Sequence, residues 1–184
     1  GGGAVDECVN IASLFLPRGQ HLMSTKGKVP STNYDYRTAL EPVDTLMPLV
    51  LMVDGGSASC SEILAGGMQD LDRAVLIGER TYGKGLVQSV RDMSFGGQLK
   101  MTTCKYYIPS GRCIQAYDYR HLNADGSAKT LPDSLTHVFH TAGGREVRDG
   151  GGVMPDVKVQ PDSLPSMLFD LTSSDEFFTY TTRY

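Results

Sequence analysis

The stretch LVLMVDGGSASCSEILAGGMQDLDRAVLIGERTYGKG, residues 49–85, determines the fold that this sequence predicts. It opens on an uninterrupted apolar run at 49–53, which is typical of a strand covered on both faces in a parallel sheet. A second apolar run follows at 74–77. Between the two runs the apolar residues share one helical face: Cys60, Ile63, Leu64, Met68 and Leu71. The order strand, helix, strand predicts a right-handed crossover between two parallel strands.

This crossover has a consequence for the position of a functional site. It places the ends of both strands at one edge of the sheet, so we expect the loops 54–59 and 78–85 to lie side by side. Ligand and reaction sites of open α/β sheets gather at this edge. The two loops are therefore where the sequence predicts a site.

The segments around this unit complete an α/β fold of one domain. Apolar residues at helical spacing from Val5 predict a helix that ends before Pro17, and the polar residues 24–46 predict a loop with a short edge strand at 34–37. Residues 86–93 and 98–108 flank a glycine turn and predict a β-hairpin.

The C-terminal third is less regular in its pattern. Residues 117–152 are rich in Asp, Gly, His and Arg, which predicts an irregular excursion with a short helix near 133–139. We expect a short strand at 157–159 and two helices at 162–172 and 174–183.

Composition excludes several classes of protein. The 184 residues are 40% hydrophobic and 21% charged, as in a soluble globular domain. The net charge of −4 and the lack of a basic cluster argue against a nucleic-acid partner. No apolar run approaches the roughly 20 residues that span a bilayer. No signal peptide precedes the core, and the opening glycines resemble a start inside a domain.

The four cysteines do not predict a metal site. They lack CxxC spacing and an accompanying zinc-type histidine pattern, so we expect neither a metal nor another cofactor. We interpret them mostly as small buried hydrophobic residues, with a disulfide between Cys104 and Cys113 left open by their spacing: Cys8, Cys60, Cys104 and Cys113.

Three serines lie where the first strand of the unit turns into the helix: Ser57, Ser59 and Ser61. Nucleophiles of hydrolases occupy such a strand-to-helix turn. The commoner explanation is structural, because Ser59 followed by Glu62 matches a capping box at a helix N-terminus. The turn alone does not decide between these interpretations.

A serine nucleophile also needs a base within hydrogen-bond reach. None of the four histidines lies in either loop at the sheet edge: His21, His121, His137 and His140. Lys84 does lie there, in the sequence TYGKG, and glycines on both sides would let the backbone pack closely and bury it. The alternative for Lys84 is an ordinary solvent-exposed loop lysine.

Two longer stretches make the pattern specific: GGSASCSEILAGGMQDLDRAVLIGERTYGKGLVQ (55–88) and LKMTTCKYYIPSGRCIQ (99–115). They resemble the C-terminal-processing, or tail-specific, serine peptidases, and the resemblance extends from the opening glycines through MPDV at 154–157. It implies a layered core like that of ClpP and crotonase. It further implies that residues 1–184 belong to a catalytic core whose upstream part and PDZ domain lie outside this chain.

The resemblance assigns roles to particular residues. The family's nucleophile is the second serine of a GSAS element, its base is the lysine of an F/Y-G-K-G element, and a glutamine four residues later orients that lysine. These correspond to Ser59, Lys84 and Gln88. The 25-residue spacing from Ser59 to Lys84 is the family's usual one and favours Ser59 over Ser57 and Ser61.

Other positions match the motif with supporting roles. The opening glycines resemble the end of the family's Arg-x-Asn-x-Gly-Gly element, so Gly2, or else Gly3, would donate one N–H to an oxyanion hole and Cys60 the other. The Cys60 thiol itself is expected to point into the helix packing. Structural roles near the catalytic residues are expected for three more: Glu62, Asp70 and Thr81.

The resemblance implies a serine endopeptidase with a Ser/Lys dyad that cleaves polypeptides near flexible C-termini, in the periplasm or another extracytoplasmic space. Two other classes stay open. One is a non-catalytic protein- or ligand-binding module of the same superfamily, and the other is a crotonase-like acyl-transfer enzyme, for which the sequence shows no coenzyme A pocket. The oligomeric state is also left open.

Overall fold

The computed structural model describes residues 1–160, 165–174 and 176–183. The α-helices are α1 (Val5–Ser13), α2 (Cys60–Asp70), α3 (Ser166–Ser173) and α4 (Glu176–Arg183), with 3-10 turns at Pro30–Thr32, Ser94–Gly96 and Asp133–Leu135. The strands are β1 (His21–Gly27), β2 (Tyr34–Arg37), β3 (Val50–Val53), β4 (Val75–Gly78), β5 (Leu86–Asp92), β6 (Gln98–Tyr107), β7 (Tyr117–Leu122), β8 (Ala128–Thr130), β9 (Val138–His140), β10 (Glu146–Arg148) and β11 (Val157–Lys158).

The predicted strand, helix, strand unit is present. Strands β3 and β4 pair in parallel, with Val53 opposite Gly78, and α2 connects them. Strand β11 joins the other side of β4, also in parallel, to complete a three-stranded sheet. Both loops that follow β3 and β4 leave the same edge of this sheet, and the N–H of Tyr82 donates to Ser57 O at 3.0 Å across them. The predicted α/β fold class is confirmed.

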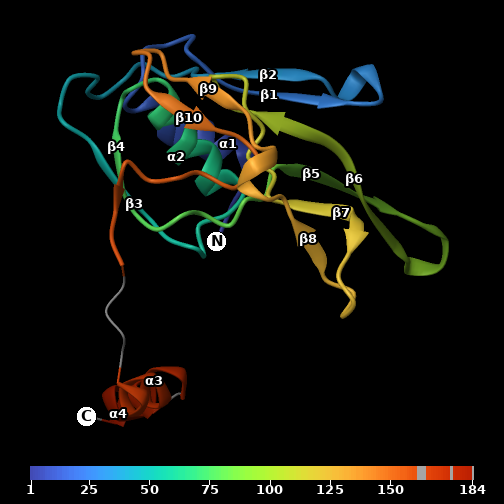
Figure 1. The fold of residues 1–184 in the computed structure, drawn as a ribbon, viewed down its shortest axis with the longest axis vertical. Coiled ribbons are helices and arrows are strands. Elements are labelled where there is room, and N and C mark those ends of the chain that lie inside the picture. Colours follow the sequence, from blue (N-terminus) through green and yellow to red (C-terminus); the bar gives the residue numbers. More distant parts are fainter. Residues whose placement is uncertain (161–164, 175, 184) are drawn as a thin grey trace.

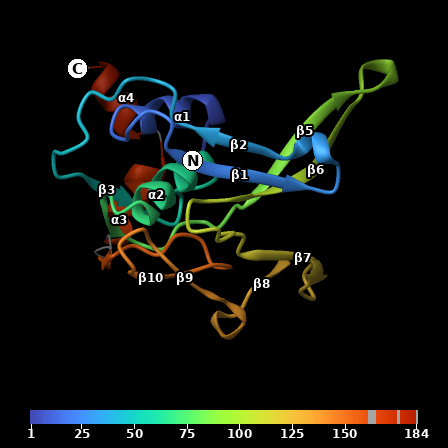
Figure 2. The same cartoon turned by 90° about the horizontal axis from the view of Figure 1, so that it is seen from above.

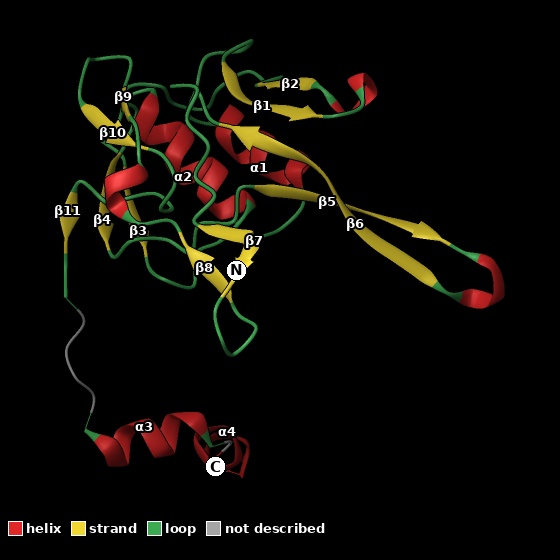
Figure 3. Cartoon of the chain, turned by 45° about the vertical axis from the view of Figure 1, so that its right-hand side comes forward, coloured by secondary structure: helices red, strands yellow, loops and turns green. Residues whose placement is uncertain are grey.

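A second, four-stranded antiparallel sheet has the order β2-β1-β6-β5. Its β5–β6 ribbon is the predicted hairpin and projects from the body of the molecule (Figure 3). Strand β2 is the predicted edge strand, but β1 corrects the expectation of loop from residue 24 onward. The burial pattern of β1 does not alternate, because the apolar pair Leu22 and Met23 is followed by a buried Thr25, so the period of a strand is absent from its sequence.

Helices α1 and α2 lie between the two sheets (Figures 1 and 2). Helix α1 buries Cys8, Val9 and Ala12, as its spacing predicted. Helix α2 packs against α1, β1 and β4. Its buried face and the inward residues of β4 and β6 make one continuous core that includes Ile63, Met68, Leu76, Tyr106 and Ile108.

Two other expectations are corrected. Residues 117–152 are not merely irregular, since they form the small hairpins β7–β8 and β9–β10, and only one 3-10 turn replaces the helix expected near 133–139. Strand β3 is also not covered on both faces within the described residues, because Val50 and Met52 are 53% and 89% exposed. One face of β3 packs on the core, while no described element lies over the other.

The predicted C-terminal helices are confirmed as α3 and α4, which stand apart from the two sheets in Figure 1. Residues 162–164 and 175, which the sequence assigned to these helices, lie outside the described residues. Among the described residues, no helix has the length and apolarity needed to cross a membrane.

Candidate active site

Ser59 lies on a strained turn between β3 and α2. Its φ of 57° and ψ of −119° put a residue with a side chain in a region that normally favours glycine. Such outliers persist only where the surrounding structure holds them, and they concentrate at functional sites. The turn has the strand-to-helix form that exposes a serine at the edge of a sheet.

The neighbouring serine hydroxyls are engaged in other bonds. Ser57 Oγ donates to Asp54 Oδ1 at 2.9 Å, which closes the loop after β3. Ser61 Oγ donates to the carbonyl oxygen of Gly1 at 2.5 Å. These contacts give Ser57 and Ser61 structural functions and favour Ser59 as the reactive hydroxyl.

Glu62 connects the serine turn to the lysine loop. Its side chain is fully buried, and Oε2 accepts from the N–H of Ser59 at 2.8 Å and from the N–H of Lys84 at 2.9 Å. The other oxygen accepts from Thr81 Oγ1 and from the N–H of Gly83, both at 2.6 Å. Glu62 thus supplies its part of the predicted capping box and fixes both loops through one carboxylate.

Tyr106 is a second connection that the sequence did not predict. It comes from β6 in the other sheet and is 1% exposed. Its hydroxyl donates to Lys84 O at 2.5 Å and lies 3.4 Å from Ser59 O. Burial, together with the neighbouring Glu62 charge, raises the pKa of Tyr106, so the hydroxyl stays protonated and remains a donor.

The lysine loop depends on close backbone packing at its glycines. A Cβ on Gly83, whose φ is +87°, would lie 2.3 Å from Ala116 Cβ, and a Cβ on Gly85 would lie 2.7 Å from Gln115 N. Gln115 Oε1 also accepts from the N–H of Gly85 at 2.7 Å. The glycines that flank Lys84 therefore allow the close approach that the sequence suggested.

Lys84 itself is half-buried, and none of the ion pairs between described residues includes it. Lys84 and the exposed Gln88 line one cavity of about 380 Å³. No hydrogen bond joins Lys84 to Ser59 or to Gln88 through their side chains. Hydrogen bonds between catalytic groups are often long or unformed without substrate.

The opening glycines lie directly against the serine turn. A Cβ on Gly2 would lie 2.9 Å from both Ala58 O and Ser59 Cβ, and 3.5 Å from the N of Cys60. Gly3 has no atom within 4 Å of the corresponding position. Gly2 therefore lies in close contact with the turn that carries Ser59 and Cys60, and the carbonyl oxygen of Gly3 lies 2.9 Å from Cys60 Sγ.

The two remaining predicted residues, Thr81 and Asp70, lie at opposite ends of α2. Thr81 is buried, donates to Glu62 and accepts from the N–H of Val153 at 2.7 Å. Asp70 lies at the other end of α2, ten residues after Cys60 and therefore about 15 Å along the helix axis. It contacts Arg112 and Ser110 there, so its function is structural and separate from Ser59.

The histidine rings and the cysteine thiols have no place in the candidate chemistry. Three histidine rings contact Ser24, Asp118 or Asp149, and His140 lies on β9. All four cysteines are free, so the open disulfide between Cys104 and Cys113 is not formed. The Cys60 thiol is buried and lies 2.9 Å from Gly3 O, as expected for a group that points into the packing. Burial raises the pKa of the neighbouring Cys8 thiol to about 12.

Comparisons with known proteins relate the chain to a family of peptidases. The model of a family described as "Peptidase family S41" matches residues 1–126. The carboxy-terminal-processing protease of Bartonella bacilliformis is 38% identical over 114 residues, which are 62% of this chain and 26% of that protein. The chloroplastic carboxyl-terminal-processing peptidase 1 of Arabidopsis thaliana is 39% identical over 127 residues, 67% of this chain and 26% of that protein.

A solved structure extends the similarity over nearly the whole chain. A photosystem II D1 C-terminal processing protease superimposes with a TM-score of 0.60 at 29% identity, over 96% of this chain and 37% of that one. The chain thus spans about a quarter of the length of the curated relatives named above.

Proposed function

The chain belongs to peptidase family S41, whose members are serine peptidases, and from this premise we propose that it forms the catalytic part of an endopeptidase that cuts proteins near their C-termini. Ser59 is the nucleophile and Lys84 the general base in this proposal. Residues 1–184 then form part of a catalytic core, and the rest of the core and a PDZ domain belong to the longer protein.

The assignment of Ser59 and Lys84 rests on a hydrogen-bond acceptor that their backbones share. The backbone N–H groups of Ser59 and Lys84 donate to the same oxygen, Glu62 Oε2, at 2.8 and 2.9 Å. Their two nitrogens can therefore be no farther apart than 5.7 Å, the sum of those distances. Ser59, on a strained turn, and Lys84, whose amine makes no ion pair within the described residues, thus start from neighbouring positions in space, as a nucleophile and its base require.

The proposed reaction begins with transfer of the Ser59 hydroxyl proton to the Lys84 amine. Ser59 Oγ then attacks the scissile carbonyl, and the proton passes to the leaving amine as the acyl-enzyme forms. Water, deprotonated by the same amine, hydrolyses the ester. The N–H groups of Gly2 and Cys60 would stabilise the oxyanion, at about 3 to 4 kcal/mol per donor in other enzymes. Gln88 is proposed to orient the lysine.

The substrates proposed are unfolded or flexible protein C-termini. The support is the family and its relatives named as carboxyl-terminal-processing enzymes, among them one from a bacterium and one from a chloroplast. We also propose an extracytoplasmic compartment on the same basis. No nucleic acid and no small-molecule cofactor enter this proposal.

The decisive test is substitution of the dyad in the full-length protein. Ser59→Ala and Lys84→Ala should each abolish hydrolysis of an unfolded polypeptide, and Ser59→Ala should also abolish labelling by a serine-acylating probe. Ser61→Ala and Lys100→Ala are matched controls that should retain turnover. Turnover by either dyad variant would refute the assignment. A folded wild-type protein that neither cleaves nor labels would indicate the non-catalytic binding module instead.

A further inference from the structure

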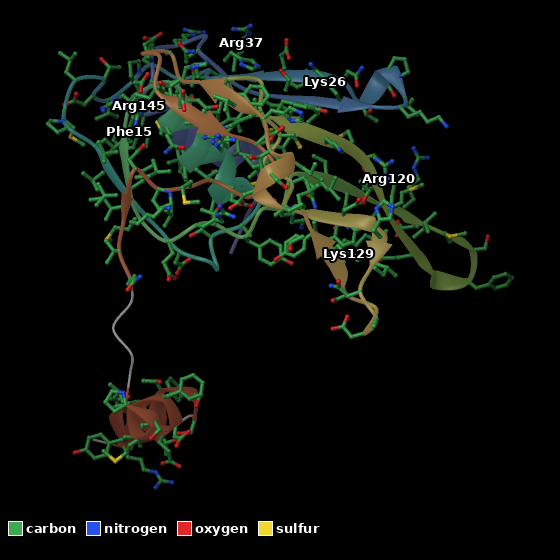
Figure 4. All side chains as sticks on the ribbon, viewed as in Figure 1. Phe15, Lys26, Arg37, Arg120, Lys129 and Arg145 are labelled. Atoms are coloured by element: carbon green, nitrogen blue, oxygen red, sulfur yellow. The ribbon has the colours of Figure 1, made fainter. Side chains whose placement is uncertain are left out.

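The cavity beside Lys84 has an unusual lining. One wall is the β5–β6 ribbon and the other is β7, and together they enclose about 380 Å³. The lining residues combine cations with polar and aromatic groups: Lys84, Leu86, Gln88, Thr102, Lys105, Gln115, Tyr117, Asp118, Tyr119 and Arg120. Figure 4 shows Arg120 on β7, on the side of the β5–β6 ribbon.

Positive charge is in excess in this cavity. Neither Lys105 nor Arg120 takes part in any ion pair between described residues. The one carboxylate, Asp118, accepts from His121 at 2.7 Å and from the N–H of Arg120 at 3.0 Å. These bonds, the one to His121 first, lower the pKa of Asp118, so it stays ionised and cancels only one of the positive charges.

The β7 wall of the cavity is held in place by contacts with the lysine loop. Gln115 Oε1 accepts from the N–H of Gly85, next to Lys84, and Gln115 Nε2 donates to Tyr117 O at 2.9 Å. The rings of Tyr82 and Tyr117 contact each other with centroids 5.1 Å apart and an angle of 39° between their planes. The aromatic wall of the cavity is thus joined to the lysine loop at two points, which fixes β7, the strand of Arg120, next to the Lys84 loop.

Lys84 and Lys105 are separated by only a short distance along the β5–β6 ribbon. Lys105 is directly opposite Leu86 in the β5–β6 pairing, and Leu86 follows Lys84 by two residues. Two residues of extended chain span about 7 Å. A peptide whose scissile bond lies beside Lys84 would therefore bring a group only a few residues away to Lys105 and Arg120.

We propose that this cavity binds a carboxylate of the substrate peptide, in the first place the α-carboxylate of its C-terminus, through Lys105 and Arg120. The inference rests on the proposed function and deepens it. The catalytic core would then itself favour cleavage close to a chain end, because Lys105 and Arg120 bind the terminal carboxylate only a short distance from the scissile bond.

The test uses the full-length protein and peptides that share one cleavage sequence and end, a few residues later, in a free carboxylate or an amide. The wild type should cleave the free acid about tenfold faster in kcat/KM, as expected for charge-assisted hydrogen bonds. Lys105→Gln and Arg120→Gln should each reduce that ratio toward one. Lys100→Gln, on the same strand but outside the cavity, is the matched control and should keep the wild-type ratio.

Two further peptides identify the source of the carboxylate. Lengthening the tail beyond the cleavage site by ten uncharged residues should remove the preference for the free acid, which a distant C-terminus-binding domain would preserve. An amidated peptide with a glutamate as its last residue should regain fast cleavage if a side-chain carboxylate can also bind. In that case Lys105→Gln should slow it.

The outcomes separate the two proposals. If Ser59→Ala abolishes cleavage but Lys105→Gln and Arg120→Gln keep the wild-type ratio, the cavity proposal is wrong and the peptidase proposal stands. If the wild type cleaves acid and amide equally, the cavity proposal is also wrong. If cleavage survives Ser59→Ala, the proposed function fails first.

Discussion

The two ends of helix α2 each bury a carboxylate, and they stabilise it in different ways. Glu62, in the first turn, is 0% exposed and accepts four hydrogen bonds from three backbone N–H groups and one hydroxyl. Asp70, in the last turn, is 1% exposed and lies 2.8 Å from the buried guanidinium of Arg112. The first carboxylate has neutral donors only, while the second has a cationic partner.

The difference indicates separate functions. Bonds from backbone N–H groups fix the loops themselves, so Glu62 positions the backbone of Ser59 and Lys84 without placing a cation beside the lysine. Asp70 and Arg112 instead join α2 to the chain after β6, where Ser110 N–H also donates to Asp70 at 3.0 Å. One end of the helix organises the site, and the other end stabilises the fold.

The largest effect should come from breaking the ion pair. Arg112→Met leaves Asp70 buried without its counter-charge, which costs about 3 to 5 kcal/mol in comparable cases. The side chain also loses its bonds to Gln69 Oε1 and Arg148 O. The free energy of unfolding in urea would measure this loss, with the exposed Arg91→Met as the control.

A double variant tests whether charge is the cause. Asp70 Oδ1 lies 2.8 Å from Arg112 Nη2 and has no other partner among the described residues, so the buried carboxylate depends on the guanidinium charge. Burial also lowers the pKa of Arg112, against the opposing effect of Asp70. Asp70→Asn combined with Arg112→Met should therefore recover about half the loss or more. A double variant as unstable as Arg112→Met alone would contradict the ionic explanation.

A smaller effect is expected at the other end of the helix. Glu62→Gln keeps the volume of the side chain but replaces one acceptor oxygen with an NH₂ group. Because an NH₂ group cannot accept a hydrogen bond, the N–H and O–H donors that face it lose their acceptor. Leaving a buried donor unsatisfied costs about 1 to 3 kcal/mol, and we expect about 2 kcal/mol here. Activity should fall with it, because the Lys84 loop loses an anchor. Urea unfolding and kcat would be measured together.

The exposed Glu79 offers a control on the same sheet edge. Glu79→Gln should change the free energy of unfolding by less than about 0.5 kcal/mol. If Glu62→Gln were equally harmless, Glu62 would not be the connection between the two loops, and the contrast between the ends of α2 would disappear.

The sequence was sufficient for the parts of this arrangement that depend on local pattern. The apolar runs of β3 and β4 and the helical spacing between them predicted the crossover, and the crossover put Ser59 and Lys84 at one edge. The match of Ser59 with Glu62 to a capping box also predicted that Glu62 would face the turn. These inferences need only short-range periodicity and chain topology.

Contacts between the sheets could not be predicted in this way. Tyr106 reaches Lys84 O from β6, and Arg112 reaches Asp70 across 42 residues of sequence. A buried tyrosine or arginine signals that its polar group needs a partner, but not which partner it finds. Strand β1 and the hairpins after residue 117 were missed for a related reason, since tertiary packing and not alternation of apolar residues holds them.

The smallest effect is expected at Tyr106, whose hydroxyl lies between the Lys84 loop and the Ser59 turn. Tyr106→Phe keeps the buried ring and removes only the hydroxyl that donates to Lys84 O. The loss of one hydrogen bond costs about 1 kcal/mol of stability. As a positioning residue, Tyr106 should affect kcat more than KM, with kcat about tenfold lower.

Tyr107→Phe is the matched control on the same strand, because Tyr107 is half-buried and its ring contacts Lys26 away from Lys84. It should leave kcat and stability close to the wild-type values. If Tyr106→Phe lost stability but kept kcat, the hydroxyl would serve the fold alone. Glu62 would then be the side chain, among the described residues, through which the Ser59 turn and the Lys84 loop are joined, and the site end of α2 would rest on one carboxylate, as the far end rests on one ion pair.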